Sequence, residues 1–222
     1  MKLIIRTTTM KILIDNGHGA RDITKGKFSP SVTGLGIDDK TIVKDRFREG
    51  EFNRLVARAL VAELKASGYD AELLVPEDTD ITLGERCRRA NAWCKKLGKD
   101  NVIVVSVHAN ALGHGNEWFD ANYWTVWTSV GQTKSDAIAT NLWNACKEVM
   151  PDKKFGSQMY HDGDVDYESQ FYILVHTSCP AVLTENFFYT NKDNLRFIAS
   201  DEGRAKIVEG HKRGIINYLK KL

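Results

Sequence analysis

The sequence VIVVSVH, residues 102–108, is a nearly unbroken apolar run that ends in a histidine. Apolar and polar residues do not alternate in it, so it predicts a strand buried on both faces. Shorter runs of the same kind cover residues 11–15 and 181–185. Strands of this kind are typical of a parallel sheet with helices packed on either side.

Further elements are expected between and after these three strands. Residues 70–75 and 122–127 predict two more strands. Apolar residues at helical spacing predict four helices: Glu51 to Ser67, a helix capped by Thr82 and ended by Gly98, a helix capped by Ser135, and residues 204–222. We therefore expect an α/β fold, with a mainly parallel or mixed sheet of about five or six strands and helices on both faces.

The domain organisation is expected to be simple. Residues 1–10 predict an N-terminal extension, and residues 11–222 predict a single domain, because no repeat or linker interrupts them. Residues 19–50 are rich in Gly and Ser without sustained periodicity, and residues 152–170 are polar and irregular. A loop as long as 19–50 in a compact domain is usually functional or disordered.

Composition excludes several functional classes. The formal net charge of +2 is too even to indicate a nucleic-acid partner. No apolar stretch approaches the roughly 18 residues that a membrane span needs. The four cysteines contain no Cys-x-x-Cys pair, so buried free thiols are expected rather than a disulfide framework. No export signal is visible, and Met10 is an alternative start.

Four residues that carry metal or proton chemistry lie at the ends of these elements. His18, His108 and Glu185 follow or close three buried strands, and Glu51 opens a helix. Chemistry in open α/β sheets gathers at the carboxyl ends of the strands. Two histidines and a carboxylate are a ligand set of catalytic zinc, and a further carboxylate can carry protons. The alternative to metal binding is a structural role. Each histidine could form hydrogen bonds within the fold, and Glu51 could stabilise the N-terminus of its helix by its negative charge.

At these residues the chain resembles the zinc-dependent N-acetylmuramoyl-L-alanine amidases of the amidase type 3 family. The resemblance implies that one zinc ion binds to His18, Glu51 and His108, that Glu185 is catalytic, and that peptidoglycan is the substrate. The resemblance also implies that the bond cleaved is the amide that joins muramic acid to L-alanine. The matching stretches occur in the family's order: DNGHG (15–19), EFN (51–53), RCRRAN (86–91), SVHANA (106–111) and PAVLTENF (180–187).

Two departures from the family pattern stand out. The segment between His18 and Glu51 is longer than in many members, and Glu49 is a competing candidate for the third ligand. After Glu185 the family commonly has glycine before phenylalanine, whereas this chain has Asn186. A different loop shape is therefore expected beside the catalytic carboxylate.

The remaining polar residues have weaker signals. Asn110 and His176 are candidate substrate-binding residues. The alternative role of Asn110 is to cap a turn, and that of His176 is to form a structural pair. Asp15 is expected to end a strand rather than to support His18. Exposure to solvent is expected for two further groups: His114, His161 and His211, and the arginines 86, 88 and 89.

The function expected is hydrolysis of an amide in peptidoglycan or a muropeptide, by a protein assumed to be monomeric. We expect it to act on the bacterial cell wall, reached by lysis of the cell, as for endolysins, or by another export route. A zinc peptidase or deacetylase on the same scaffold is one alternative. A wall-binding module without activity and an enzyme for recovered wall fragments are the others.

Overall fold

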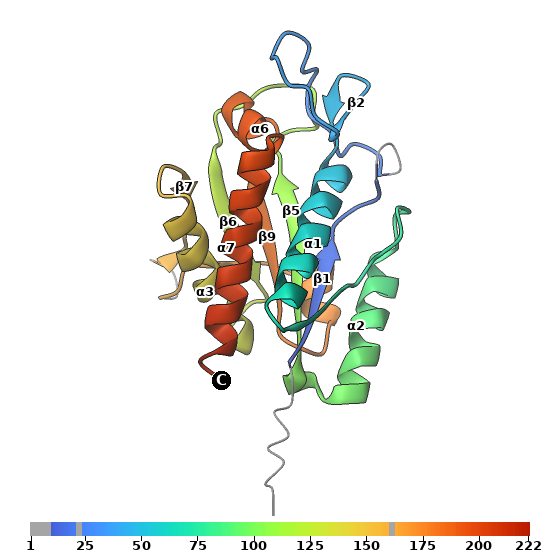
Figure 1. The fold of residues 1–222 in the computed structure, drawn as a ribbon, viewed down its shortest axis with the longest axis vertical. Coiled ribbons are helices and arrows are strands. Elements are labelled where there is room, and N and C mark those ends of the chain that lie inside the picture. The colour runs from blue at the N-terminus through green and yellow to red at the C-terminus, as the bar shows by residue number, and fades with distance from the viewer. Residues whose placement is uncertain (1–9, 21–23, 160–162) are drawn as a thin grey trace, which may run out of the picture.

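The sheet forms the centre of the computed structural model, which describes residues 10–20, 24–159 and 163–222 (Figure 1). It has seven strands in the order β4-β1-β5-β9-β6-β7, with β8 also paired to β6. β4, β1, β5 and β9 are parallel, whereas β6 is antiparallel to β9. The bounds are β1 (Lys11–Asn16), β4 (Asp70–Leu73), β5 (Val102–Asn110), β6 (Tyr123–Thr128), β7 (Lys154–Phe155), β8 (Tyr167–Glu168) and β9 (Ala181–Phe188).

The expected α/β class with a mainly parallel sheet is confirmed. Two strands of the sheet, β7 and β8, were not predicted. Each has two residues, and both lie in residues 152–170, which were expected to be irregular. Such short pairings leave no periodic pattern, because alternation needs about four residues to be visible.

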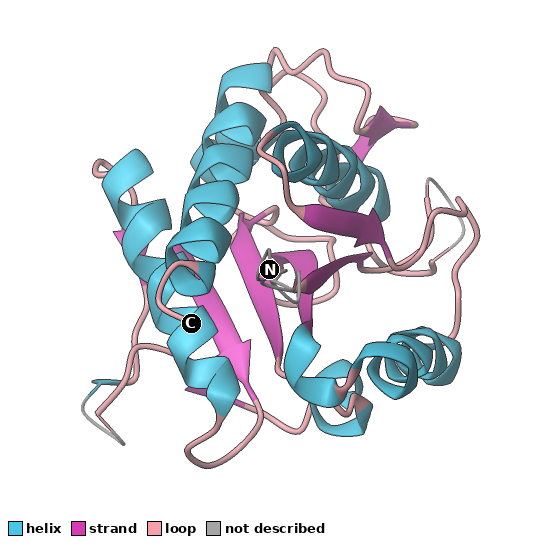
Figure 2. Ribbon diagram, turned by 60° about the horizontal axis from the view of Figure 1, so that its bottom comes forward, coloured by secondary structure: helices cyan, strands magenta, loops and turns pink. Residues whose placement is uncertain are grey.

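Helices cover both faces of the sheet (Figure 2). Successive side chains of a strand point to opposite faces, so Ile12 and Ile14 join one core while Leu13 joins the other. α1, α3 and α7 pack on the first core, and α2 and α5 on the second. The bounds are α1 (Glu49–Ala66), α2 (Leu83–Leu97), α3 (Lys134–Val149), α5 (Tyr172–His176), α6 (Lys192–Ile198) and α7 (Asp201–Leu219), with a 3-10 turn η1 (Lys99–Asn101).

The helix starts differ from expectation in three places. α1 begins at Glu49, two residues before the expected Glu51. Thr133, not Ser135, caps α3, because its side chain and that of Asp136 form a reciprocal capping box. The C-terminal region contains α6 and then α7, which starts at Asp201. Thr82 does cap α2 as expected, accepting a hydrogen bond from the backbone N–H of Glu85.

The long 19–50 segment contains a small hairpin, β2 (Ile42–Val43) and β3 (Arg46–Phe47). Its two-residue turn, Lys44 and Asp45, has positive φ at both positions, as hairpins of this length prefer. An ion pair at 2.8 Å between Asp39 and Arg204 ties the segment to α7. Part of the expected loop is therefore ordered against the core.

All four cysteines are buried free thiols, as expected. Across the described ranges, no helix combines the length and the apolar character that crossing a membrane would need.

Candidate metal centre

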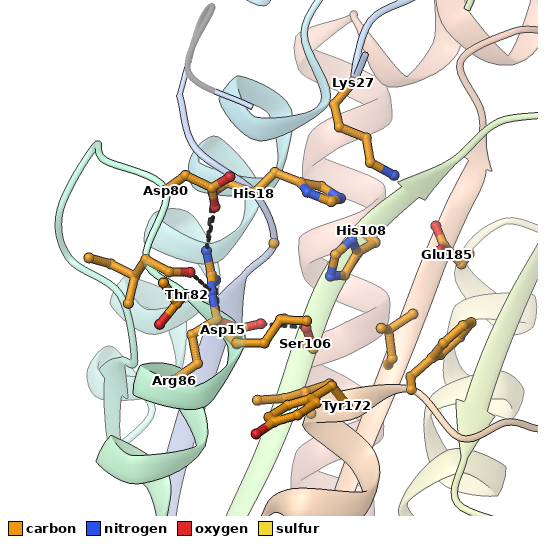
Figure 3. A pocket seen from close by; sticks show the side chains of 16 residues that line it. Asp15, His18, Lys27, Asp80, Thr82, Arg86, Ser106, His108, Tyr172 and Glu185 are labelled. Carbon is orange, nitrogen blue, oxygen red and sulfur yellow. Dashed lines mark hydrogen bonds and ion pairs between the residues drawn. The ribbon is translucent and has the colours of Figure 1, made fainter. Parts of the chain in front are cut away.

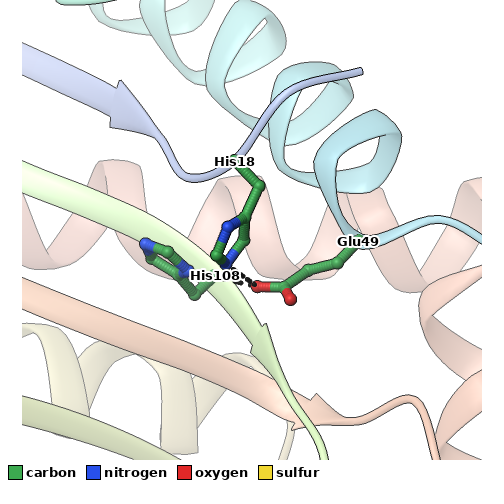
Figure 4. A group of neighbouring side chains, drawn as sticks. All are labelled: His18, Glu49 and His108. Atoms are coloured by element: carbon green, nitrogen blue, oxygen red, sulfur yellow. Dashed lines mark hydrogen bonds and ion pairs between the residues drawn. The ribbon is translucent and has the colours of Figure 1, made fainter. Parts of the chain in front are cut away.

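Two histidines and one glutamate meet at the carboxyl-terminal edge of the parallel strands (Figure 4). His18 follows β1, His108 lies near the end of β5, and Glu49 is the first residue of α1. Oε1 of Glu49 lies 3.3 Å from Nε2 of His18 and 3.1 Å from Nδ1 of His108. One potential donor atom from each residue lies within 4.8 Å of the other two, a spread that a single cation can bridge.

The glutamate in this group is Glu49, not the expected Glu51. Two residues along a helix correspond to a rotation of about 200°, so the two side chains leave α1 in different directions. Glu49 is buried, and its Oε1 also accepts a hydrogen bond from the backbone N–H of Ala109 at 3.3 Å. The charge of Glu51 instead acts on Arg54, further along α1.

A signal for Glu49 was present in the sequence. Counting at helical spacing, Glu49 shares the face of Phe52, Val56 and Leu60, all of which are fully buried. Glu51 falls outside this stripe. Because the helix was expected to start at Glu51, Glu49 was left outside it. The stripe of buried residues nevertheless extends back to Glu49.

The expected catalytic residue, Glu185, lies directly beside His108. The two residues are paired across β5 and β9 in register. Oε2 of Glu185 is buried and has no hydrogen-bond partner in the described part of the chain. Burial and the negative charge of Glu49 raise the pKa of Glu185 well above its usual value, opposed by the positive charge of Lys27. A carboxyl group with a raised pKa in such a place is suited to carrying protons.

The electrostatics of the group fit a bound cation. Burial raises the pKa of Glu49, but His18 and His108 outweigh it and hold that pKa well below its usual value. Burial lowers the pKa of His108, which favours the neutral imidazole that a metal requires. One carboxylate and two imidazoles are donor groups of a zinc site, so the residues present fit this metal.

The backbone around His18 is held in an uncommon conformation. His18 has φ of 65°, in the left-handed region. Its carbonyl oxygen accepts hydrogen bonds from Nη1 of Arg54 at 2.7 Å and from Nη2 of Arg86 at 3.4 Å. Gly17 is required for another reason, because a Cβ there would lie 2.0 Å from Cε1 of His108. The turn therefore depends on both arginines and on the absence of a side chain at residue 17.

Arg86 differs from the expectation of a solvated helix face. It is buried and forms an ion pair with Asp15 at 2.6 Å. Asp15 also accepts a hydrogen bond from the hydroxyl of Ser106 at 2.5 Å, so it serves Arg86 and β5 rather than His18. The expectation failed because the partner of Arg86 is 71 residues away in the sequence. Of the other two arginines, Arg88 is exposed and Arg89 is half-buried.

A cleft of about 500 Å³ opens beside the metal centre (Figure 3). His18, His108 and Glu185 lie on its wall together with Lys27, which comes from the 19–50 segment. The lining near α2 and α5 combines apolar and polar side chains: Ile81, Leu83, Phe171, Tyr172 and Ile173, with Asp80, Thr82 and Arg86. A substrate with both polar and apolar parts fits a cleft of this composition.

The two tentative substrate-binding residues do not lie in this cleft. Asn110 lines a smaller neighbouring cavity with Glu49 and Glu185, and its Oδ1 accepts a hydrogen bond from the N–H of Ala111 at 2.8 Å. This hydrogen bond corresponds to the alternative role expected for Asn110, which was to cap a turn. His176 is exposed at the end of α5 and stacks on the ring of Tyr172, with centroids 3.8 Å apart. This ring stacking corresponds to the alternative role expected for His176, which was to form a structural pair.

The expectation of a solvated His211 is wrong. His211 is fully buried, and its Nδ1 donates to the carbonyl oxygen of Ile207 at 2.8 Å. This leaves Nε2 to accept from the hydroxyl of Thr184 at 2.9 Å, beside Glu185 on β9. Burial lowers the pKa of His211 to about 4, so it remains neutral. His114 is exposed as expected, and His161 lies outside the described residues.

Asn186, the departure from the family pattern, occupies a specific position. Its Nδ2 donates to the carbonyl oxygen of His108 at 2.8 Å, and its Oδ1 accepts from Nε1 of Trp124 at 2.8 Å. The next residue, Phe187, has φ of 66°. Asn186 thus joins the strand that carries His108 to β6, a connection that glycine has no side chain to make.

Comparison with known proteins assigns the chain to a family. The family model described as N-acetylmuramoyl-L-alanine amidase matches residues 12–217. The endolysin of Bacillus phage SPP1 is 29% identical over 215 residues, which cover 94% of this chain and 65% of that protein. The sporulation-specific N-acetylmuramoyl-L-alanine amidase of Bacillus subtilis is 24% identical over 208 residues, or 93% of this chain and 67% of that protein. The chain thus spans about two thirds of these relatives.

Solved structures agree on the fold. An N-acetylmuramoyl-L-alanine amidase of Clostridium difficile 630 superposes with a TM-score of 0.71 at 23% identity, covering 96% of this chain and 98% of that one. The amidase AmiC2 of Nostoc punctiforme gives 0.72 at 22% identity, with 95% and 97% covered. With the family model matching nearly the whole described chain, the expected resemblance is confirmed, and the protein belongs to the N-acetylmuramoyl-L-alanine amidase family.

Proposed function

We propose that this chain is a zinc-dependent amidase that cleaves the bond between N-acetylmuramic acid and L-alanine in peptidoglycan. The observation that carries the proposal is the group of His18, Glu49 and His108 with Glu185 beside it at one edge of the sheet. Family membership and the names of the relatives support the choice of bond.

His18, Glu49 and His108 would hold one zinc ion, which leaves a coordination position open. Zinc bound there would polarise the scissile carbonyl and lower the pKa of water to about 7. Glu49 replaces the expected Glu51 in this proposal, since it is the carboxylate that lies against both histidines.

Glu185 would accept a proton from the attacking water and deliver it to the departing amine of L-alanine. Its raised pKa favours uptake of that proton, and the positive charge of Lys27 opposes the rise. The bond broken is the carbonyl carbon to nitrogen bond, and the products are a lactyl carboxylic acid and a free α-amine.

The cleft would bind the peptide and sugar parts of the substrate. Phe171, Tyr172 and Leu83 present exposed apolar surface in its lining near α2 and α5. Aromatic rings of this kind supply apolar contact and, for tyrosine, a polar tip. Residues 11–222 would act as one catalytic domain on the bacterial cell wall or on muropeptides derived from it.

The decisive experiment is digestion of purified peptidoglycan by the zinc-loaded protein, with products identified by mass spectrometry. Stem peptides with a free L-alanine amino terminus and intact glycan strands are expected. Cuts within the peptide would identify a peptidase, and loss of acetyl groups a deacetylase. Binding to the wall without any released product would identify a binding module.

Two variants separate the proposed roles. Glu185→Gln is expected to keep its zinc and to lose a factor of about 10² to 10⁴ in turnover, because it cannot take a proton. His108→Ala is expected to lose bound zinc. Full activity in Glu185→Gln, or unchanged zinc content in His108→Ala, would contradict the assignment of that residue.

A further inference from the structure

A second group of carboxylates lies away from the metal centre, where α3, β6 and the segment before β8 meet. Asp136, Asp164 and Asp166 each offer an oxygen atom within 4.8 Å of the others. β6 is antiparallel to β9, so the end of β6 at Thr128 lies toward the opposite edge of the sheet from Glu185. We propose that these three aspartates form a calcium site that joins the three elements.

Burial of unpaired oxygen atoms is the observation that distinguishes this group from an ordinary acidic cluster. Asp166 has an exposed fraction of 1%, and its Oδ1 is buried without a hydrogen-bond partner in the described residues. Oδ1 of Asp164 is in the same situation. Buried carboxylate oxygens normally have a partner, since burial of an ionised carboxylate without one is strongly unfavourable.

The other oxygen atoms of the group are fixed by neighbouring residues. Oδ2 of Asp166 accepts from the hydroxyl of Thr128, and Oδ2 of Asp164 accepts from Nε2 of Gln132 at 3.3 Å. Asp136 accepts from the N–H and hydroxyl of Thr133 in the capping box of α3. Asp164 and Asp166 are therefore each held in place through one oxygen while the other remains free for a shared ligand. Both oxygens of Asp136 already accept a hydrogen bond, so Asp136 would bind a shared ligand through a remaining lone pair.

Among the described residues, no positive side chain compensates the three carboxylates. Within the described parts of the chain, no Lys, Arg or His forms an ion pair with any of them, and nearby Lys134 is paired with Asp100 at 2.7 Å. Burial, followed by the charges of Asp164 and Asp136, raises the pKa of Asp166 to about 7 despite the hydrogen bond from Thr128. A divalent cation would remove this repulsion.

The donor atoms select the kind of cation. The group offers oxygen alone, from three carboxylates, without the imidazole of the catalytic centre or a thiolate. Calcium takes six to eight oxygen ligands in flexible geometry, whereas zinc prefers nitrogen and sulfur and magnesium demands near-ideal octahedral geometry. Carboxylates on α3 and on the segment before β8 suit the flexible cation, and its expected effect is on the stability of the fold.

Thermal unfolding of the zinc-loaded protein in calcium-depleted buffer, with and without added CaCl₂, tests the proposal. Calcium at about a hundredfold above its Kd is expected to raise Tm by about 5–10 °C. Asp166→Asn is expected to abolish that shift and, without calcium, to have the same Tm as the wild type or a higher one, because a repelling charge is removed. Asp164→Asn provides a second, less buried variant with the same expected loss.

Matched controls isolate the site. Asp120→Asn, which removes an exposed carboxylate elsewhere, is expected to keep the full calcium shift. His108→Ala is expected to keep it as well, which separates this site from the catalytic centre. No shift in the wild type would mean that Asp164 and Asp166 share a proton instead, and would overturn the proposal. An equal shift in Asp166→Asn, or a larger shift with magnesium, would overturn it too.

Discussion

Nη1 of Arg54 donates a hydrogen bond of 2.7 Å to the carbonyl oxygen of His18, and this bond connects α1 to the turn after β1. Arg54 is itself fixed, because it also donates to the carbonyl oxygens of Gly50, Glu77 and Thr79. Glu49 starts the same helix. One helix thus supplies one proposed metal ligand and holds the backbone of another.

Arg54→Lys is expected to weaken zinc binding by about 10- to 100-fold, as is typical when the support of a ligand is removed. Lysine keeps the charge but not the planar set of donors that reaches four carbonyl groups. The measurement is the Kd for zinc in competition with a chelator. Arg58→Lys, on the same helix at a half-exposed position, is the control and is expected to bind zinc as the wild type does. Equal zinc affinity in Arg54→Lys and wild type would contradict this role.

Gly17→Ala is expected to lower zinc content and activity together. The new Cβ would lie 2.0 Å from Cε1 and 2.3 Å from Nε2 of His108, so the imidazole must leave its position. Metal analysis of the purified variant provides the measurement. Gly84→Ala is a matched control, since a Cβ there has no neighbour closer than the hydroxyl of Tyr172 at 3.8 Å. Normal zinc content in Gly17→Ala would mean that His108 is not a ligand in this orientation.

Glu49→Gln and Glu51→Gln form a direct test of the third ligand. The first is expected to lose most of its bound zinc, because a neutral amide replaces the carboxylate that contacts both histidines. The second should retain zinc and activity. Zinc content per protein, measured for both variants after the same purification, gives the comparison. The reverse result would restore Glu51 as the ligand.

The sequence alone predicted the sheet and the position of three site residues for one physical reason. His18 follows β1, and His108 and Glu185 lie in the later halves of β5 and β9. Parallel strands bring their carboxyl-terminal parts to one edge of the sheet. The strands themselves are visible because burial on both faces removes the polar residues. Local pattern and simple topology were sufficient here.

The features that were missed depend on the exact start of a helix or on distant partners. The choice between Glu49 and Glu51 turns on two residues at a helix end, where patterns are least reliable. Arg86 and His211 were expected in solvent because polar side chains usually are. Arg86 on α2 is buried against Asp15 of β1, and His211 on α7 is buried against Thr184 of β9. No local sequence pattern indicates such pairings between distant elements.

Asp39→Asn is expected to destabilise the protein in a pH-dependent manner. Burial alone raises the pKa of Asp39, but hydrogen bonds from Arg204 and Thr41 outweigh it and lower that pKa below 3.8. A carboxylate with a lowered pKa stabilises the fold above the pKa of the unfolded chain, and this stability is lost as the pH falls through the folded value. Near pH 7 the variant should therefore lose about 1.5–3 kcal/mol in free energy of unfolding, the usual value for hydrogen bonds to a charged group.

Urea unfolding of wild type and Asp39→Asn between about pH 7 and pH 3 measures this difference, which should shrink below about pH 4 as Asp39 takes up a proton in the wild type. Comparison at each pH removes the effect of the histidines, because both proteins share them. Asp38→Asn, the exposed neighbour, is the control and should change the free energy of unfolding by less than about 0.5 kcal/mol. A difference that stays constant down to the lowest pH would show that the Asp39 carboxylate does not stabilise the fold by its charge. In that case the ion pair with Arg204 would not be what holds the 19–50 segment, and with it Lys27, against the body of the protein.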